Sequence, residues 1–289
     1  MLPAEGTLSD ADIARITIGV CSNDLFGSGL ADRFFKIYLT APNVQWLHLF
    51  AAGTDHPVFA AVRARGRLTS SAGAAAIPIA HTVIMHTIAL CRNARGFAIA
   101  QHDRRWAERT SIDVEGRTMG IVGLGNIGTE VARLAPHFGI HVIGMRRHPR
   151  GDEPCETWPT SRLHELLPLV DDLVLTAPLT NDTRNLIGAA ELALLRPGAH
   201  IINVGRGELI DEPALISALQ SGHVGAAALD VFVEEPLPTG NPLWDLPNVI
   251  VTPHSAGGTS KVATQRAADI FTENLGRFVR GEALINEVT

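Results

Sequence analysis

Arg206, Glu235 and His254 have the side chains needed to bind a carboxylate and to transfer a proton. They lie in the runs NVGRG, VFVEEPL and VTPHS, each close behind an expected strand. Arginine binds a carboxylate through two parallel, charge-assisted hydrogen bonds, and its charge does not titrate. Histidine exchanges protons near neutral pH, and a carboxylate bonded to the imidazole favours its protonated form and fixes its orientation. Taken singly, each residue also fits a plainer role as a solvated charge or a loop histidine.

A GxGxxG motif made by Gly123, Gly125 and Gly128 follows one expected strand and opens an expected helix. In this context the first glycine makes a tight turn, the second lets the backbone approach a pyrophosphate, and the third admits close helix packing. The helix N-terminus, which includes Asn126 and Ile127, then receives the phosphate charge. A merely glycine-rich turn is the alternative. The motif predicts a dinucleotide site.

Two arginines, Arg146 and Arg147, stand about twenty residues after the motif, where an NAD-binding chain carries Asp or Glu. Guanidinium groups cannot accept hydrogen bonds from ribose hydroxyls, but they bind a 2′-phosphate well. NADP(H) is therefore the preferred cofactor. NAD(H) stays an alternative if the two arginines are simply solvated beside the site.

The composition points to no macromolecular partner. A net charge of -6 supplies no basic field for nucleic acid or anionic lipid. The first residues lack the basic and apolar regions of a signal peptide, and the most apolar stretch, 74–91, is too short and too interrupted for a membrane span, so a cytoplasmic protein is expected. Cys21, Cys91 and Cys155 are odd in number and lack ligand spacing, which predicts packing roles and no disulfide framework or metal site.

The order of sequence patterns predicts an α/β fold. From Thr118 onward, expected helices over 127–138, 191–195 and 212–221 alternate with strands in the runs TMGIVG, HVIGM, DLVLTA, AHIINVG, GAALDV and NVIVTP. Such alternation is typical of a doubly wound parallel Rossmann sheet. The dinucleotide-binding domain is expected over residues 78–262.

Residues 1–77 predict a second, smaller α/β domain that binds substrate. Its expected strands lie in the runs ITIGVCS and VQWLHLFAAG, with a helical segment between them. A long helix over 78–101 would connect the two domains. A final helix over 260–280 would return the chain to the first domain, so that residues 263–289 complete it.

The runs GLGNIG, NVGRGELIDEPAL, ALDVFVEEPLP and NVIVTPHSAG together closely resemble the D-isomer-specific 2-hydroxyacid dehydrogenase family, particularly members similar to glyoxylate/hydroxypyruvate reductases. The likeness extends from about residue 51 to the end. It implies an oxidoreductase, a 2-ketoacid reductase that moves a hydride between NADP(H) and a small 2-oxo or D-2-hydroxy acid. It also implies a reduced flavodoxin-like smaller domain and a homodimer formed through the long helix and the cofactor domain.

The resemblance assigns roles to individual residues. Arg206 would bind the substrate carboxylate and touch the nicotinamide, while Glu235 would support His254, the proton donor. Gly53 and Thr54, in the run AAGTD, would hold the substrate carboxylate, with a plain strand-to-helix turn as the alternative. Beside the glycine motif and the two arginines, the expected cofactor contacts are Ala177, Pro178, Thr183, Val204, Gly205 and Asp230, the last against the nicotinamide carboxamide.

Two features depart from the family pattern. Only about fifty residues precede Gly53, so compared with the family pattern we expect an initial strand and helix to be missing, either because the domain is reduced or because the chain is truncated. If an exposed sheet edge results, it would need a partner strand, a covering loop or a charged rim. His81 stands where glutamate is common, and packing in the core or in an interface is expected for it.

Two other functions compete with a 2-hydroxyacid dehydrogenase. The same fold serves in cofactor-sensing binding proteins, because fold alone does not fix function. A formate dehydrogenase is disfavoured, since members of the family with that activity carry glutamine where Glu235 stands.

Overall fold

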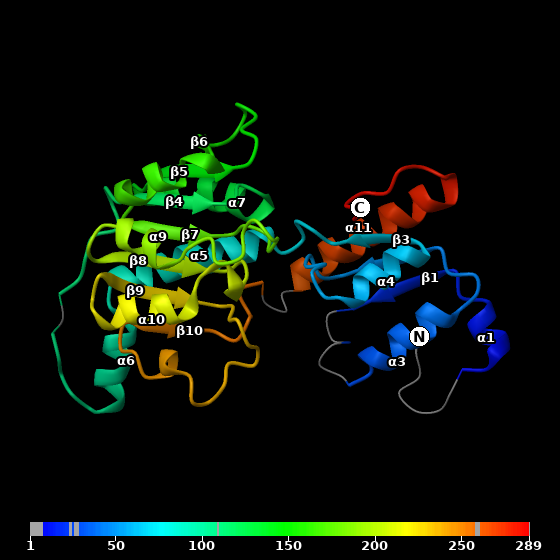
Figure 1. The fold of residues 1–289 in the computed structure, drawn as a ribbon, viewed down its shortest axis with the longest axis horizontal. Helices are drawn as coiled ribbons and strands as arrows, with labels where there is room; N and C mark the ends of the chain where they lie inside the picture. Colours follow the sequence, from blue (N-terminus) through cyan, green and yellow to red (C-terminus); the bar gives the residue numbers. More distant parts are fainter. Residues whose placement is uncertain (1–7, 23–24, 26–28, 109, 258–260, 289) are drawn as a thin grey trace. The chain divides into compact units, whose positions relative to one another are not determined.

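The computed structural model describes residues 8–22, 25, 29–108, 110–257 and 261–288, and the chain divides into two compact units (Figure 1). The larger unit spans Ala76–Gly258, and the smaller unit combines Met1–Ala75 with Thr259–Thr289. The boundaries drawn from the sequence lie at 77/78 and 262/263. Both divisions assemble the smaller unit from the two ends of the chain.

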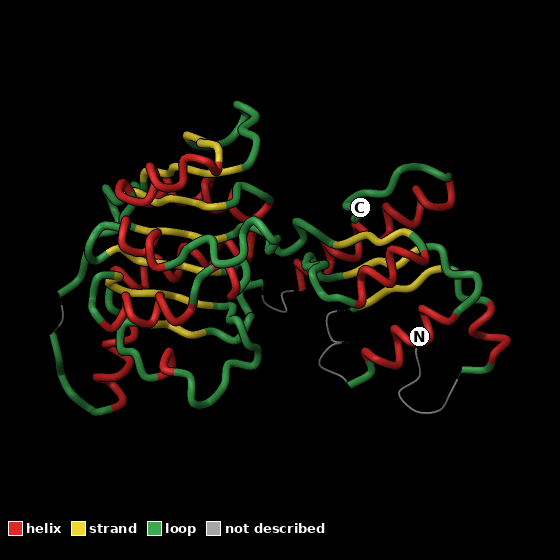
Figure 2. Tube along the Cα trace, in the orientation of Figure 1, coloured by secondary structure: helices red, strands yellow, loops and turns green. Residues whose placement is uncertain are grey.

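A parallel sheet forms the centre of the larger unit (Figure 2). Its described strands are β4 (Thr118–Val122), β5 (His141–Arg146), β6 (Glu156–Pro159), β7 (Asp172–Leu175), β8 (Ala199–Asn203), β9 (Val224–Leu229) and β10 (Val249–Val251). They lie in the order β10-β9-β8-β7-β4-β5-β6. Because the chain runs outward from β4 to β6 and then returns to β7 on the other side of β4, the predicted doubly wound sheet is confirmed.

Alternate side chains of the central strands build a hydrophobic core on each face of this sheet. Leu173 and Leu175 of β7 belong to one core, whereas Val174 between them belongs to the other. Helices cover both faces, as buried parallel strands require. These helices are α5 (Ala76–Cys91), α6 (Ala94–His102), α7 (Asn126–Leu134), α8 (Leu163–Leu166), α9 (Ala189–Leu194) and α10 (Glu212–Gln220). Among the described strands of this sheet, only β6 was not expected, because its run ETWP mixes polar residues with a proline.

The prediction of one long helix over residues 78–101 is wrong. The chain forms α5 and α6 instead, with a break at Asn93, whose φ of 53° is left-handed. A residue in this conformation interrupts a right-handed helix, and asparagine tolerates it better than most residues. His81 of α5 is exposed, so its expected packing in the core is also wrong. Packing of His81 in an interface stays a prediction.

The smaller unit contains a three-stranded parallel sheet in the order β1-β2-β3. Its described elements are α1 (Asp10–Ala14), β1 (Ile18–Cys21), α3 (Ala31–Thr40), β2 (Trp46–Leu49), α4 (Val58–Arg65), β3 (Arg67–Ser70) and α11 (Lys261–Arg280). Trp46 is fully buried and stacks against Phe271 and Phe278 of α11, with ring centroids 5.5 and 5.4 Å apart. This aromatic packing holds α11 against the sheet that the first residues of the chain form.

The two edges of the smaller sheet differ. The C-terminal segment covers the outer edge of β3, where Ser70 N donates to Asn286 O at 3.2 Å and Val288 N donates to Leu68 O at 2.8 Å. A covering segment is one of the ways in which proteins protect a sheet edge. No strand within the described residues pairs with the outer edge of β1.

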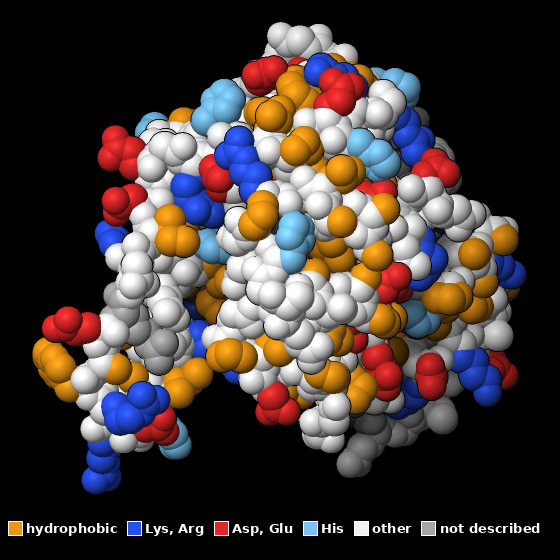
Figure 3. All heavy atoms as spheres, turned by 60° about the vertical axis from the view of Figure 1, so that its left-hand side comes forward, with side chains coloured by type: hydrophobic (Ala, Val, Ile, Leu, Met, Phe, Trp, Pro, Cys, Tyr) orange, Lys and Arg blue, Asp and Glu red, His pale blue; other side chains and the backbone are white. Residues whose placement is uncertain are grey.

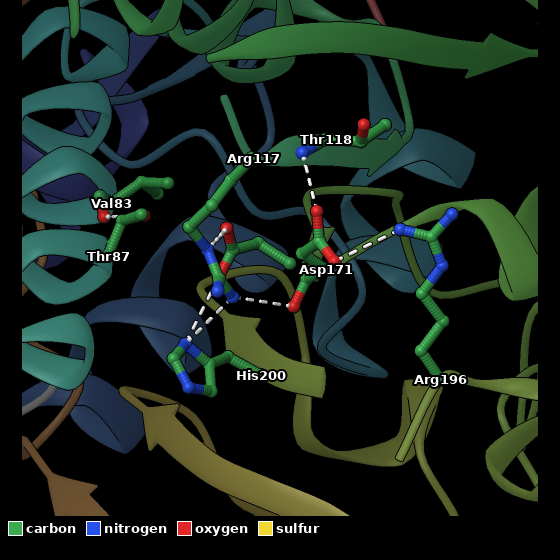
Figure 4. A network of polar contacts seen from close by, with 8 residues as sticks. Val83, Thr87, Arg117, Thr118, Asp171, Arg196 and His200 are labelled. Atoms are coloured by element: carbon green, nitrogen blue, oxygen red, sulfur yellow. Dashed lines mark hydrogen bonds and ion pairs between the residues drawn. The ribbon is translucent and has the colours of Figure 1, made fainter. Parts of the chain in front are cut away.

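A buried polar cluster closes the amino edge of the larger sheet (Figure 4). Arg117, just before β4, donates to both carboxylate oxygens of Asp172 at 2.7 and 2.8 Å, and His200 Nδ1 lies 3.2 Å from Asp172 Oδ1. Asp171 accepts a hydrogen bond from Thr118 N and pairs with Arg196. Burial alone would raise the pKa of Asp172, but hydrogen bonds from His200 and Arg117 outweigh it and lower that pKa.

The same cluster contains a set of side chains that resembles a metal site. Ligand atoms of Cys91, Asp172 and His200 all lie within 4.8 Å of one another, although their segments are far apart in the sequence. The Arg117 guanidinium, however, already supplies the cation that neutralises Asp172. Burial also raises the pKa of Cys91 to about 11, which keeps the thiol protonated and a poor ligand. We therefore assign this cluster to stability.

The surface of the larger unit mixes apolar, acidic and basic side chains on the face seen in Figure 3. Within the described part of the chain, no helix combines the length and the apolar character needed to cross a membrane. Cys21 and Cys91 are buried, as packing roles require, Cys155 is half-buried, and all three thiols are free.

Candidate active site

The residues expected to act together in the larger unit follow the carboxyl ends of neighbouring strands. His254 follows β10, Glu235 follows β9 and Arg206 follows β8. Ala177 follows β7, the glycine motif follows β4, and Arg146 is the last residue of β5. Because all these strands are parallel, their carboxyl ends form one edge. Three strand spacings separate β8 from β5, roughly 14 Å at the usual distance between strands.

The glycine motif forms the turn that a pyrophosphate requires. Gly123 has a φ of 108°, and a Cβ there would lie 2.6 Å from Ala177 N, so only glycine fits. A Cβ at Gly128 would collide with Gly123 O. A Cβ at Gly125 would meet nothing within 4 Å, which leaves open space at the N-terminus of α7. The three positions therefore fit the tight turn, the close packing and the phosphate approach expected of them.

The loop after β7 is held against the glycine turn. Thr176 Oγ1 donates to Gly123 O at 2.7 Å. Farther along, Thr183 Oγ1 donates to Pro178 O at 2.7 Å and accepts from Thr180 N at 2.8 Å. Thr183 thus closes the loop on itself, and Thr176 attaches the loop to the expected pyrophosphate site.

The backbone on both sides of Arg206 is fixed by Asn203. Its side-chain oxygen accepts from Gly205 N at 3.0 Å, and its side-chain nitrogen donates to Arg206 O at 2.8 Å. Val204 and Gly205 are buried, whereas Arg206 is half-buried. A Cβ at Gly207 would collide with the backbone of Phe232, so this segment packs directly on the loop after β9. The sequence reading missed Asn203, although an amide three residues before an arginine is a recognisable signal for such a turn.

His254 and Glu235 form a hydrogen-bonded pair. His254 Nδ1 lies 2.7 Å from Glu235 Oε2, and Glu235 Oε1 accepts from Phe232 N at 2.9 Å. The side chains are 52% and 35% exposed, respectively. With Nδ1 bonded to the carboxylate, Nε2 is the atom of His254 that can exchange a proton with a bound molecule.

Asp230 holds the loop that carries His254. Its carboxylate is 1% exposed and accepts from Thr252 Oγ1 at 2.6 Å, Ser255 N at 2.9 Å and Ala256 N at 2.8 Å. His254 N donates to Asp230 O at 2.8 Å, and His254 has a left-handed φ of 48°. Strained backbone of this kind persists where its surroundings fix it. Sequence reasoning missed this supporting role, and the expected contact of Asp230 with a nicotinamide carboxamide stays a prediction.

Arg146 and Arg147 each bind a carboxylate. Arg146 Nη1 donates to Glu153 Oε1 at 3.1 Å, and Arg147 Nη2 donates to Asp182 Oδ2 at 3.1 Å. The first pair is largely buried and the second is exposed. The two arginines were treated as equivalent in the sequence, and they differ in the structure.

Gly53 and Thr54 lie in the smaller unit, in irregular backbone after β2. Close to them, Ser71 N donates to Ala51 O at 3.1 Å, and His48 bridges Thr69 Oγ1 at 2.7 Å and Ser71 Oγ at 3.0 Å. Burial lowers the pKa of His48 to about 4, so the imidazole is neutral. This buried network braces the segment expected to hold substrate. The role of Gly53 and Thr54 stays a prediction.

Comparison with known proteins agrees with this fold. Residues 84–256 match the model of the NAD binding domain of D-isomer specific 2-hydroxyacid dehydrogenases. A glyoxylate reductase from Aeropyrum pernix is 38% identical over 208 residues, which are 68% of this chain and 62% of that protein. The chain therefore spans less than two thirds of the length of this relative.

Solved structures give the same result over nearly the whole chain. A D-isomer specific 2-hydroxyacid dehydrogenase from Xanthobacter autotrophicus, in complex with NADPH and MES, is 31% identical with a TM-score of 0.79 and covers 96% of this chain and 85% of its own. An NADPH-dependent glyoxylate/hydroxypyruvate reductase from Sinorhizobium meliloti, in complex with NADP and sulfate, is 29% identical with a TM-score of 0.78 and covers 95% and 85%. The chain belongs to the D-isomer specific 2-hydroxyacid dehydrogenase family, which confirms the resemblance seen in the sequence.

Proposed function

We propose that this protein is an NADP(H)-dependent reductase of a small 2-oxo acid, with glyoxylate and hydroxypyruvate as the first substrates to test. The hydrogen bond between His254 and Glu235 is the main observation behind this proposal. Both residues come after strands that end at the same edge of the sheet as the strands before Arg206 and the glycine turn. Relatives named glyoxylate reductase and glyoxylate/hydroxypyruvate reductase support this choice of substrate.

In the proposed reaction, bound NADPH supplies the hydride that reaches the carbonyl carbon. Arg206 binds the substrate carboxylate through its guanidinium and so fixes the orientation of the neighbouring carbonyl group. His254 Nε2 donates a proton to the carbonyl oxygen, which becomes the hydroxyl of the product. Glu235 holds the imidazole through Nδ1 and so orients Nε2 for the transfer. His254 is 52% exposed, so solvent can return the proton afterwards.

Residues along the sheet edge would hold the dinucleotide. Gly123, Gly125 and Gly128, with Asn126 and Ile127, would receive the pyrophosphate at the start of α7. Arg146 and Arg147 would bind the 2′-phosphate. The remaining proposed contacts are Ala177, Pro178, Thr183, Val204, Gly205, Arg206, Asp230 and His254. Gly53 and Thr54 of the smaller unit would bind the substrate carboxylate.

A homodimer formed through α6 and the segment after it is part of the proposal. Phe97, Trp106 and Ile112 in this region are 44%, 99% and 46% exposed. Exposed aromatic and aliphatic side chains that recur over a short region are typical of an interface. The free thiols of Cys21, Cys91 and Cys155 fit a reducing compartment, and we propose the cytoplasm.

The test is oxidation of NADPH and NADH with glyoxylate, hydroxypyruvate and pyruvate, followed through the absorbance of the reduced nicotinamide. Turnover that prefers NADPH and disappears in Arg206→Gln is the expected result, because the guanidinium would no longer hold the carboxylate. Tight dinucleotide binding without turnover of any 2-oxo acid would contradict the proposal and favour a cofactor-sensing binding protein.

A further inference from the structure

Arg146 lies directly beside the expected pyrophosphate site. Gly123 N and Leu124 N both donate to Met145 O, at 3.0 and 2.9 Å, so the backbone of the residue just before Arg146 is bonded to the glycine turn. A Cβ at Gly144 would collide with the side chain of Leu124, so β5 and the turn also pack closely. The origin of the Arg146 side chain is therefore fixed relative to this turn.

The Arg146 guanidinium is held by a carboxylate that is itself held by the backbone. Glu153 Oε1 accepts from Arg146 Nη1 at 3.1 Å and from Arg150 N at 2.7 Å, while Glu153 Oε2 accepts from Gly151 N at 2.8 Å. The Glu153 side chain is 5% exposed. The two backbone donors, Arg150 first, lower the pKa of Glu153, and the positive φ of Gly151, 88°, brings them together.

Arg147 is held far less firmly. Its partner Asp182 is 78% exposed, and Arg147 itself is 65% exposed. Ion pairs this exposed contribute little and are screened by salt. By contrast, the Arg146 side chain is 22% exposed, and among the described residues Glu153 is its only hydrogen-bond partner. The Nε and Nη2 groups of Arg146 are thus left to bind an anion.

We propose that Glu153 is a positioning residue for cofactor selectivity, holding the Arg146 guanidinium so that Arg146, more than Arg147, recognises the 2′-phosphate of NADP(H). The proposal rests on the cofactor site proposed above. A side chain already fixed in place loses little conformational entropy when it binds, whereas Arg147 must be ordered at that moment. Glu153 therefore favours the phosphate through Arg146 even though its own charge repels phosphate.

Two carboxylates of the chain make a matched test possible. Glu153→Gln and Asp182→Asn each remove one negative charge beside one of the two arginines. If charge alone matters, both substitutions strengthen phosphate binding. If positioning matters, Glu153→Gln weakens it and Asp182→Asn does not. The probes are adenosine 2′,5′-bisphosphate and 5′-AMP, which differ only in the 2′-phosphate. Isothermal titration of the whole protein gives the ratio of the dissociation constant for 5′-AMP to that for adenosine 2′,5′-bisphosphate.

We expect Glu153→Gln to lower this ratio roughly tenfold, as for loss of a hydrogen bond to a charged group, while Asp182→Asn leaves it unchanged or raises it. Glu153→Asp, which keeps the charge but shortens the reach, should act in the same direction as Glu153→Gln. In the Arg146→Gln background, Glu153→Gln should have no further effect on the ratio. Thermal unfolding of each variant shows that the proteins compared are folded.

The proposal is overturned if Glu153→Gln leaves the ratio unchanged or raises it as Asp182→Asn does. It is also overturned if Glu153→Gln lowers the ratio equally in the Arg146→Gln background, since Glu153 would then act on the loop as a whole. A wild-type protein that does not distinguish the two nucleotides rejects the NADP(H) assignment itself. That result is recognised before any variant is made.

Discussion

His200 pairs with Asp172 at the amino edge of the larger sheet, and His254 pairs with Glu235 at the carboxyl edge. The first two side chains are 4% and 0% exposed and are closed off by Arg117, whereas the second two are 52% and 35% exposed. A histidine paired with a carboxylate therefore forms a closed structural cluster at one edge and an accessible pair at the other. Burial and the presence of a neutralising cation make the difference, because a proton carrier must reach its substrate.

The largest expected effect is on turnover at the carboxyl edge. His254→Ala should lower turnover about a thousandfold, because a positioned proton donor contributes on this order. The dissociation constant for NADPH and the midpoint of thermal unfolding should change little, since the imidazole is exposed. Steady-state kinetics and nucleotide titration measure both. If the variant kept nearly full turnover, His254 would not be the proton donor. Its pair with Glu235 would then have no more part in the reaction than the buried pair of His200 and Asp172.

At the amino edge we expect a loss of stability that is similar in free energy to the thousandfold loss of turnover. Asp172→Asn leaves Arg117 buried without its counter-charge and should lower the free energy of unfolding by about 3–5 kcal/mol, measured in urea. Asp171→Asn is the matched control, because Asp171 pairs with the more exposed Arg196 and its loss should cost about 1 kcal/mol. Equal losses for the two variants would remove the distinction between the buried cluster and its surroundings. Cofactor binding should be retained in both.

A smaller change is expected when the exposed pair loses its charge. Glu235→Gln keeps the size of the side chain but replaces the charged hydrogen-bond partner of His254 Nδ1 with a neutral one. Turnover should fall roughly ten- to a hundredfold, the equivalent of one hydrogen bond to a charged group. Glu234→Gln, at the exposed neighbouring position, should leave turnover unchanged. If both substitutions had the same effect, the hydrogen bond between Glu235 and His254 would not matter for the reaction.

The smallest expected effect concerns a histidine without a carboxylate partner. His86 of α5 is 2% exposed, and neither ring nitrogen has a hydrogen-bond partner in the described part of the chain. Burial lowers its pKa, against a weaker opposing effect of Asp230. His86→Leu should therefore stabilise the protein by about 1 kcal/mol, because it removes unsatisfied buried polar groups. His81→Leu, at the exposed position on the same helix, should not.

The lowered pKa of His86 also predicts how the stability of the protein depends on pH. With the pKa of His86 lowered in the folded state, only the unfolded chain takes up this proton below about pH 6.5, so stability is lost as the pH falls below that value. Denaturant unfolding between pH 7 and pH 5 should show a smaller loss for His86→Leu than for the wild type. The pKa of His48 is also lowered, to about 4, so His48 contributes to the loss of stability at low pH in both the wild type and the variant. An identical pH dependence in both would contradict the prediction.

Much of the fold was predictable because it depends on local patterns. Apolar runs gave every described strand of the larger sheet except β6, and the glycine spacing predicted the turn before α7. The missed elements are short or polar, as β3 with the run RLTS shows. The break at Asn93 was missed because helical periodicity continues through it and a single left-handed residue leaves no pattern.

The candidate site, like the fold, was predictable from the sequence only in part. Arg206, Glu235 and His254 were identified by residue type and family resemblance, and the structure adds the groups that hold them. Asn203 bonds backbone two and three residues further along its own loop, which is a local pattern. Asp230 bonds the backbone of Ser255 and Ala256, which only the folded chain brings within reach. The partners of Asp230 cannot be read from spacing, because they depend on where β9 and β10 end.

By itself, the sequence determined which residues can bind a carboxylate, donate a proton and cradle a phosphate, because these abilities belong to the side chains and to the glycine spacing. Only the tertiary structure decided which of them work together. Strand order brought His254, Glu235 and Arg206 to one edge of the sheet, and burial separated Arg146 with Glu153 from the exposed Arg147. A hydrogen bond depends on distance and on exclusion of water, and both are properties of the packed chain.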